Sequence, residues 1–182
     1  MFTKILSKLR LAKLKLQFGK CLEVPWKGTF LGKVKLNINE NGKLKIGKGF
    51  SCRDNVLFNI SVGGAKVEIG SDTFISDGCK LNARKNISIG SGCIIGQNVL
   101  MYDHDHNYHN FENLRNDFIV NDIIISDDVW IGSNVIILRG TSIGQGCVIG
   151  AGSIIKGKIE HGTLVYPSQS QVLKRIREGN DI

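Results

Sequence analysis

The chain has 182 residues, 42% of them hydrophobic, and a formal net charge of +8. This length and apolar content suit one domain with a sizeable core, and 22 glycines beside only 2 prolines indicate tight turns rather than disordered linkers. No apolar run is long enough to span a membrane and no secretory signal stands at the front, so we expect a cytoplasmic protein.

The positive charge is concentrated at the beginning of the chain. Residues 1–50 contain 12 lysines and arginines against Glu23 and Glu40, a net of 12 − 2 = +10, which leaves −2 for the remainder. Residues 2–13 place apolar side chains at helical spacing among lysines, and these are Phe2, Ile5, Leu6, Leu9 and Ala12. We predict a basic amphipathic helix that either caps a repeat domain or binds anionic lipid or a carrier-linked glycan at the inner membrane face. Nucleic acid is not expected, because no aromatic side chains or known nucleic-acid module accompany the charge.

The next segment alternates apolar and polar residues. The pattern runs from Leu14 to Phe18 and again from Val34 to Ile38, and Asn41-Gly42 marks a turn. We therefore predict strands here and assign residues 1–44 to an N-terminal helix with capping strands.

Residues 45–165 contain a six-residue repeat. Its clearest part opens each hexad with isoleucine at positions 125, 131, 137, 143, 149 and 155. A period of six is divisible by two but is far from a multiple of 3.6, so it favours extended segments over a helix. Three hexads form one three-sided coil, and the earlier hexads from Ile46 to Met101 bring the total to about five coils. The pattern predicts an all-β fold, a parallel β-helix of triangular section.

The fifth position of each hexad carries a small residue. Cys79, Cys93 and Cys147 occupy it, where other hexads have threonine, valine or serine. Small buried thiols are therefore expected, because five cysteines without a CxxC motif fit neither a disulfide framework nor a zinc cage. Glycines that follow the aliphatic residue, Gly132, Gly144 and Gly150, are expected to supply the permissive backbone of the corners.

The repeat is interrupted by an insertion at residues 102–124. Three of the four histidines, His104, His106 and His109, lie within six positions there. An insertion of this length in a tight repeat is usually functional. The histidines have three interpretations: a metal site, a solvated polar loop or a general base. A general base requires an imidazole in a cleft beside an acceptor hydroxyl.

The motifs resemble those of a known family. Three segments are similar to motifs of the hexapeptide-repeat acyltransferases, most closely the sugar and polysaccharide O-acetyltransferases. They are Ile95-Gly-Gln-Asn98-Val99, which runs into the histidine loop, Val129-Trp-Ile-Gly-Ser-Asn-Val135 and Val148-Ile-Gly-Ala-Gly-Ser153. The resemblance implies a left-handed β-helix, a homotrimer, and acetyl-CoA lying between subunits with no metal required. It also implies that His106 is the catalytic base, seven residues after Val99, with His104 as the alternative.

The same resemblance assigns residues to the two substrates. It implies cofactor contacts for Trp130, Gly132, Ser133, Gly150, Ala151, Lys156 and Lys174, the last on a C-terminal helix within residues 166–182. Acceptor contacts are expected from Asp77, Asn82, Asp103 and His104. Either Asp103 or Asp105 is expected to orient the catalytic ring.

The sequence departs from the family pattern at two places. Tyr166-Pro167-Ser-Gln-Ser-Gln171 replaces the usual segment before the last helix, and Gly78 stands near the position of an acceptor-binding asparagine, which is why Asp77 or Asn82 is expected to substitute. We expect an acetyl-CoA-dependent O-acetyltransferase acting on a sugar or surface-polysaccharide precursor. The rival interpretations are acetylation of an antibiotic hydroxyl, a zinc carbonic anhydrase and a solenoid without chemistry.

Overall fold

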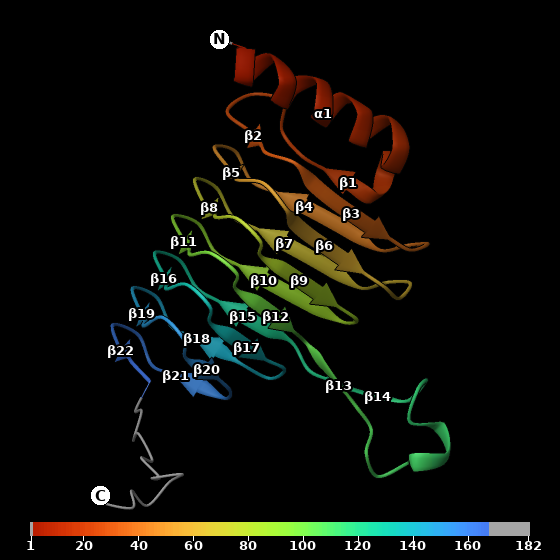
Figure 1. The fold of residues 1–182 in the computed structure, drawn as a ribbon, viewed down its shortest axis with the longest axis vertical. Coiled ribbons are helices and arrows are strands. Elements are labelled where there is room, and N and C mark those ends of the chain that lie inside the picture. Colours follow the sequence, from red (N-terminus) through yellow and green to blue (C-terminus); the bar gives the residue numbers. More distant parts are fainter. Residues whose placement is uncertain (1, 168–182) are drawn as a thin grey trace, which may run out of the picture.

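A computed structural model describes residues 2–167 and shows a three-sided prism of stacked strands with a helix across one end (Figure 1). Sheet A contains β1 (Leu22–Glu23), β4 (Lys43–Ile46), β7 (Lys66–Ile69), β10 (Asn86–Ile89), β15 (Ile123–Ile125), β18 (Ser142–Ile143) and β21 (Lys158–Ile159). Sheet B contains β2 (Phe30–Leu31), β5 (Ser51–Cys52), β8 (Phe74–Ile75), β11 (Ile94–Ile95), β16 (Trp130–Ile131), β19 (Val148–Ile149) and β22 (Leu164–Val165). Sheet C contains β3 (Val34–Ile38), β6 (Val56–Ile60), β9 (Lys80–Ala83), β12 (Leu100–Tyr102), β17 (Ile136–Leu138) and β20 (Ile154–Ile155).

The chain visits sheets A, B and C in turn, so each circuit is one coil of a parallel β-helix. Like residues stack in register, as Ile89, Ile125 and Ile143 do through successive strands of sheet A. The predicted fold class is confirmed. The first coil is built from β1, β2 and β3, however, so the solenoid starts at Leu22 rather than residue 45 and has about six coils rather than five.

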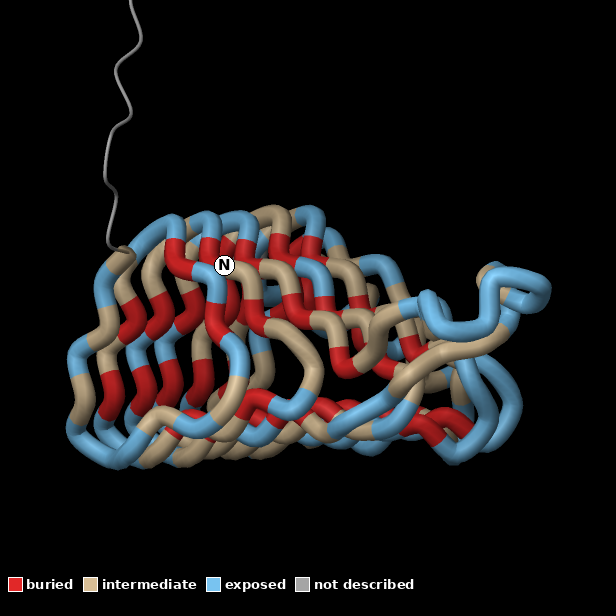
Figure 2. The backbone as a smooth tube through the Cα atoms, turned by 90° about the horizontal axis from the view of Figure 1, so that it is seen from below, coloured by how far each residue is buried: buried red, intermediate tan, exposed pale blue. Residues whose placement is uncertain are grey.

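The core is filled by the first and fifth residues of the hexads (Figure 2). All six isoleucines of the clearest repeat are buried, and so are the fifth-position residues from Val129 to Ser153. Burial follows from the strand geometry, because side chains alternate between the two faces of a strand and only one face points into the prism.

Glycine is required at these repeat positions for a different reason from the one predicted. Gly132 and Gly144 do not adopt positive φ; instead a Cβ atom at either would lie 2.6 Å and 2.5 Å from backbone nitrogen of the next coil, at Ala151 and His161. Glycine is needed there because neighbouring backbones approach closely. The left-handed conformation falls later in the hexad, where Asp128 and Asn134 have φ of 58° and 59°.

The fifth-position thiols and hydroxyls donate hydrogen bonds to carbonyl groups of the adjacent coil. The Sγ atom of Cys79 lies 3.0 Å from the Gly96 oxygen, and that of Cys147 lies 2.9 Å from the Glu160 oxygen. Burial raises the pKa of Cys79 to about 11 and the pKa of Cys52 to about 12. These cysteines are free core residues, as the sequence predicted.

Helix α1 (Phe2–Phe18) covers the open end of the first coil, and η1 (Gly19–Cys21) connects it to β1. The prediction of strand for residues 14–18 was wrong, because the helix continues to Phe18. The hydroxyl of Ser7 accepts the Leu31 N–H at 2.8 Å, and Arg10 donates to the Leu31 carbonyl at 3.2 Å. These side chains satisfy backbone groups at the edge of sheet B, which has no further strand to pair with.

Among the described residues, no helix is both long enough and apolar enough to cross a bilayer. The predicted C-terminal helix and Lys174 lie outside the described part of the chain.

Candidate active site

The insertion forms an antiparallel hairpin that projects from the prism (Figure 2). It consists of β13 (His104–His106), η2 (Phe111–Asn113) and β14 (Phe118–Val120), with His106 opposite Phe118. The hairpin leaves the solenoid after β12, at the turns that connect sheet C to sheet A, which we call the C–A corner. Strand pairing thus gives His104 and His106 defined positions, while His109 lies in the turn beyond β13.

His106 is exposed, and its ring is held by two contacts. The Nδ1 atom lies 2.6 Å from the backbone oxygen of Leu114, and the ring lies 4.4 Å from that of Phe118, centroid to centroid. A carbonyl oxygen can only accept, so Nδ1 carries the proton and Nε2 keeps its lone pair. This is the tautomer that a general base needs.

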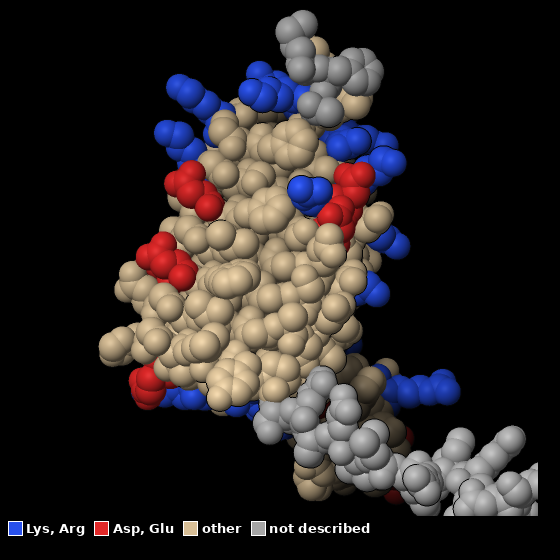
Figure 3. Space-filling model, turned by 60° about the vertical axis from the view of Figure 1, so that its left-hand side comes forward, with Lys and Arg blue, Asp and Glu red and all other residues tan. Residues whose placement is uncertain are grey.

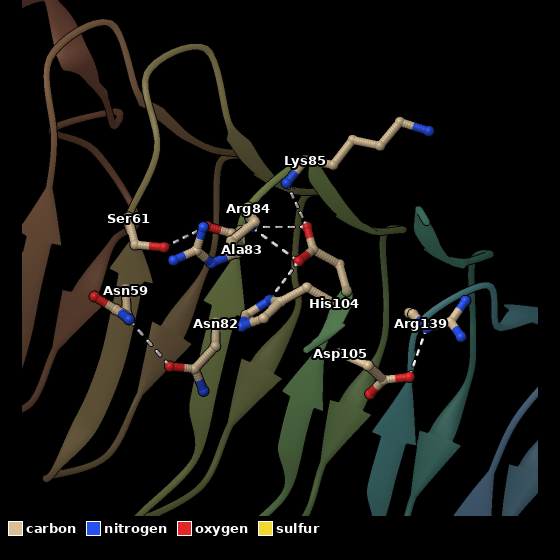
Figure 4. Close-up of polar contacts among 10 residues, drawn as sticks. Asn59, Ser61, Asn82, Ala83, Arg84, Lys85, His104, Asp105 and Arg139 are labelled. Carbon is tan, nitrogen blue, oxygen red and sulfur yellow. Dashed lines mark hydrogen bonds and ion pairs between the residues drawn. The ribbon is translucent and has the colours of Figure 1, made fainter. Parts of the chain in front are cut away.

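Asp103 is fully buried, and its carboxylate is occupied by the protein. It accepts the backbone N–H groups of Arg84 and Lys85 at 2.7–3.0 Å and lies 2.9 Å from Nδ1 of His104 (Figure 4). Asp103 therefore orients His104, not His106. The structure gives Asp103 an internal position rather than the solvent-facing one that acceptor contact requires.

Two arginines hold the base of the hairpin from neighbouring coils. The guanidinium of Arg84 lies 3.4 Å from the centre of the Phe118 ring. Arg139 Nε lies 2.5 Å from Asp105 Oδ2 (Figure 4). Asp105 thus ties β13 to the end of β17 and does not contact the ring of His106. These contacts limit movement of the hairpin relative to the prism.

The two histidines share a small pocket of about 280 Å³. Its lining consists of Tyr102, His104, Asp105, His106 and Leu138. Asn82 is opposite Tyr102 in the sheet register, so it lies beside this pocket. His109 stacks against Tyr108 further along the hairpin. Within the described residues, no group of three histidine, cysteine or acidic side chains is placed to hold a metal ion.

A second group of predicted residues gathers at the turns from sheet B to sheet C, which we call the B–C corner. Trp130 pairs with Val148 in sheet B. The following Gly132-Ser133 stack against Gly150-Ala151 of the next coil, where the Gly152 N–H donates to the Ser133 oxygen at 2.9 Å. Trp130 is 55% exposed. Five of the seven predicted cofactor residues therefore form one continuous surface.

The remaining predicted residues are divided between the two corners. Asp77 lies at the B–C corner, where its carboxylate accepts the Asp54 N–H at 3.2 Å, so within one chain it is not beside His106. Lys156 is exposed at the C–A corner, after β20. The full width of sheet C thus separates the histidine pocket from the Trp130 surface within one chain (Figure 1).

The outward side chains of sheet B form an apolar column. Successive strands contribute Phe30, Ser51, Phe74, Ile94, Trp130, Val148 and Leu164. Ile94 and Leu164 are 52% and 61% exposed, and Figure 3 shows a broad face almost free of charge. An aligned apolar face of this kind is typical of a protein interface.

Sequence reasoning missed three groups at the site. The Leu114 carbonyl could not have been found, because a backbone group leaves no residue-type signal. Arg84 and Arg139 lie far from the histidines in the chain, and the repeat register would have placed them at the same C–A corner.

The sequence has relatives among known proteins. Residues 122–157 match the family "Bacterial transferase hexapeptide (six repeats)". A protein of Escherichia coli (strain K12) named as a lipopolysaccharide biosynthesis O-acetyl transferase, WbbJ, is 26% identical over 148 residues, which cover 76% of this chain and 74% of that protein. The polysialic acid O-acetyltransferase of Escherichia coli O1:K1 / APEC is 35% identical over 83 residues, which cover 44% of this chain and only 27% of that protein.

The fold is also found among solved structures. A hexapeptide-repeat-containing acetyltransferase from Vibrio cholerae O1 biovar eltor, crystallised with acetyl coenzyme A, superimposes with a TM-score of 0.57 and 23% identity, covering 97% of this chain and 86% of that one. In its repeat sequence the chain is similar to the hexapeptide-repeat transferases, and it shares the left-handed β-helix fold of the hexapeptide-repeat acetyltransferases. It is an enzyme of the acyltransferase class.

Proposed function

We propose that this protein transfers the acetyl group of acetyl-CoA to a hydroxyl group of a sugar or bacterial surface-polysaccharide precursor, such as one of capsule, exopolysaccharide or lipopolysaccharide. The observation that carries the proposal is the hydrogen bond between His106 Nδ1 and the Leu114 oxygen, which leaves the lone pair of the neutral imidazole on Nε2, in a ring that lines the histidine pocket. The related lipopolysaccharide and polysialic acid O-acetyltransferases support the choice of a glycan hydroxyl.

The proposed reaction is a direct transfer. Nε2 of His106 takes the proton of the acceptor hydroxyl as its oxygen attacks the thioester carbonyl carbon. The negative charge that develops on the carbonyl oxygen is met by backbone N–H groups of the facing coil. The carbon–sulfur bond then breaks, and the imidazolium returns its proton to the CoA thiolate. The Leu114 carbonyl accepts a hydrogen bond from Nδ1–H throughout and stabilises the imidazolium.

The proposal places the thioester between copies in a homotrimer. Pantetheine would lie along Trp130 and the glycine turns of one subunit, and His106 would come from its neighbour. The separation of these groups within one chain and the apolar column of sheet B support this arrangement. Lys156 and Lys174 would meet the phosphates of CoA. The enzyme would act in the cytoplasm.

The acceptor would occupy the other side of the histidine pocket. Asn82 lies beside Tyr102 there, and its amide can both donate to and accept from sugar hydroxyls. His104 has Nδ1 engaged by Asp103, so its Nε2 atom is the nitrogen that can reach an acceptor. We assign Asp103 to holding His104 and Asp77 to holding the neighbouring turn of Asp54 at the B–C corner.

The test uses purified protein, acetyl-CoA and a panel of sugars and surface polysaccharides. Release of CoA thiol and the mass of the acceptor are measured together, so that transfer is separated from thioester hydrolysis. We expect O-acetylation of at least one glycan. Acetylation only of amines, or no acceptor-dependent release of thiol, would contradict the proposal.

A further inference from the structure

Helix α1 has two apolar stripes, although the end of the prism uses only one. The stripe that packs against the first coil consists of Ser7, Leu11, Leu14 and Phe18, with Leu11 only 2% exposed. The second stripe consists of Ile5, Leu9, Ala12 and Leu16, and we call it the outer stripe. At 3.6 residues per turn, the two stripes lie on opposite sides of the helix.

The outer stripe is open to solvent. Ile5, Leu9 and Leu16 are 50%, 62% and 89% exposed. Capping therefore does not account for it, because the residues needed to cover the core are those of the other stripe. An apolar stripe on the far side of a packed helix is expected to face a further apolar medium.

The charges on the helix restrict what that medium can be. The helix carries Lys4, Lys8, Arg10, Lys13 and Lys15 and no acidic residue. Lys8 and Lys15 project on one side of the outer stripe and Lys13 on the other, where their long side chains can extend away from a buried stripe. Trp26, which is 53% exposed, adds an aromatic ring 4.8 Å from the Lys15 ammonium.

A second copy of the same helix fits this surface poorly, because it would bring lysines against lysines. Nucleic acid would pair with the lysines but leave the aliphatic stripe in water. An anionic bilayer satisfies both, since aliphatic side chains enter the acyl boundary while lysines meet the headgroups.

We infer that α1 docks this protein on an anionic lipid surface through the outer stripe and its flanking lysines. The helix lies across the end of the prism, so docking leaves sheets B and C and the hairpin clear of the bilayer (Figure 1). The inference does not depend on the proposed acetyl transfer. Helix α1 covers the first coil, whereas the histidine pocket lies several coils further along the prism.

The test is sedimentation of the full chain with vesicles of phosphatidylcholine alone or with an equal part of phosphatidylglycerol. Wild type is expected to pellet with the anionic vesicles, and added salt is expected to weaken binding. The paired change Leu9→Glu/Leu16→Glu is expected to lower the partition coefficient by about tenfold or more. These positions are exposed, so the fold is expected to be kept, which circular dichroism checks.

Two controls separate the contribution of the apolar side chains from that of the net charge. Lys66→Glu alters the net charge by the same amount as the paired change, but at an exposed position of β7, and is expected to bind within about twofold of wild type. Leu9→Ser/Leu16→Ser leaves the charge unchanged and is expected to lose binding as well. Failure of wild type to pellet, equal loss with Lys66→Glu, or full binding by the serine pair would overturn the inference.

Light scattering of the same variants completes the test. If Leu9→Glu/Leu16→Glu lowers the molecular mass in solution, the stripe joins two copies and the lipid proposal is wrong. Acetyl transfer to a water-soluble acceptor without vesicles is expected to be unchanged by these substitutions, so failure of either proposal can be recognised separately.

Discussion

The Nδ1 atom of His106 lies 2.6 Å from the backbone oxygen of Leu114, a residue on the returning half of the same hairpin. Because the oxygen can only accept, Nδ1 carries a proton, and the neutral imidazole therefore keeps its lone pair on Nε2. The shape of the hairpin thus selects the basic tautomer of the histidine before any substrate binds.

The first prediction concerns this imidazole. Replacing His106 with alanine is expected to lower turnover by about two to four orders of magnitude, because proton removal from the acceptor is lost. CoA affinity, measured by calorimetry, is expected to be retained. His109→Ala, at an exposed position of the same hairpin, is the matched control and is expected to stay near wild type. If His104→Ala abolished turnover while His106→Ala did not, the base would be His104.

The second prediction concerns the buried carboxylate of Asp103. In Asp103→Asn, an amide NH₂ would face backbone N–H donors of Arg84 and Lys85, which costs about 1–3 kcal/mol of unfolding free energy. Asp105→Asn is the control, because that carboxylate is 42% exposed and its pair with Arg139 is expected to contribute about 1 kcal/mol or less. Urea denaturation measures the unfolding free energy of both variants. Equal losses would show that the burial of Asp103 does not determine the cost of its replacement.

The third prediction concerns the apolar column of sheet B. Trp130→Glu is expected to dissociate the assembly, because a charge would be buried in the contact between copies. Ile124→Glu, at a 45% exposed position of sheet A, is expected to leave the mass in solution unchanged. Analytical ultracentrifugation measures both. A monomeric wild type, or dissociation by Ile124→Glu alone, would rule out this face as the interface.

The fourth prediction concerns alkaline stability. Burial raises the pKa values of Cys52 and Cys79 from 9.0 to about 12 and about 11. Above pH 9 the unfolded chain releases these protons while the folded chain keeps them, so stability is complete below pH 9 and falls as pH rises. The loss between pH 9 and pH 10 is about 1 kcal/mol for each thiol.

The control for this alkaline loss of stability is the double variant Cys52→Ala/Cys79→Ala. The variant is less stable at neutral pH because it has lost buried volume, but its stability is expected to fall less steeply from pH 9 to pH 10 in urea titrations. Identical slopes for the two proteins would mean that these thiols do not control the alkaline loss.

The periodicity of the sequence was enough to predict the prism. A six-residue period is specific because every hexad repeats the same burial, and the six isoleucines that open the hexads from Ile125 to Ile155 are buried as expected. The start of the solenoid was missed because the first coil lacks a regular hexad. The residues Leu14 to Phe18 alternate like a strand, but packing of Leu14 and Phe18 on the core keeps them helical.

The site was only partly predictable for a related reason. Sequence spacing identifies which residues share a corner, so the grouping of Trp130, Gly132 and Ala151 follows from the repeat. The hairpin has no repeat, and its contacts depend on three-dimensional closure. The partner of Asp103 is therefore His104 rather than His106, and a backbone oxygen holds the ring of His106.

The central claim is that one site is built from two copies of the chain, with His106 from one and the Trp130 surface from its neighbour. Two inactive proteins test it: His106→Ala, and Ala151→Trp, which is expected to block the cofactor surface at an exposed turn. Unfolding the two together in equal amounts and refolding them makes mixed trimers. About a quarter of the sites then combine an intact histidine with an intact surface, because the interface repeats head to tail around the ring.

The measurement is acetyl transfer by that mixture, compared with each protein refolded alone. The account predicts that activity returns to about a quarter of the wild-type value. A mixture as inactive as its two components would contradict it, because the histidine and the cofactor surface would then have to belong to the same chain.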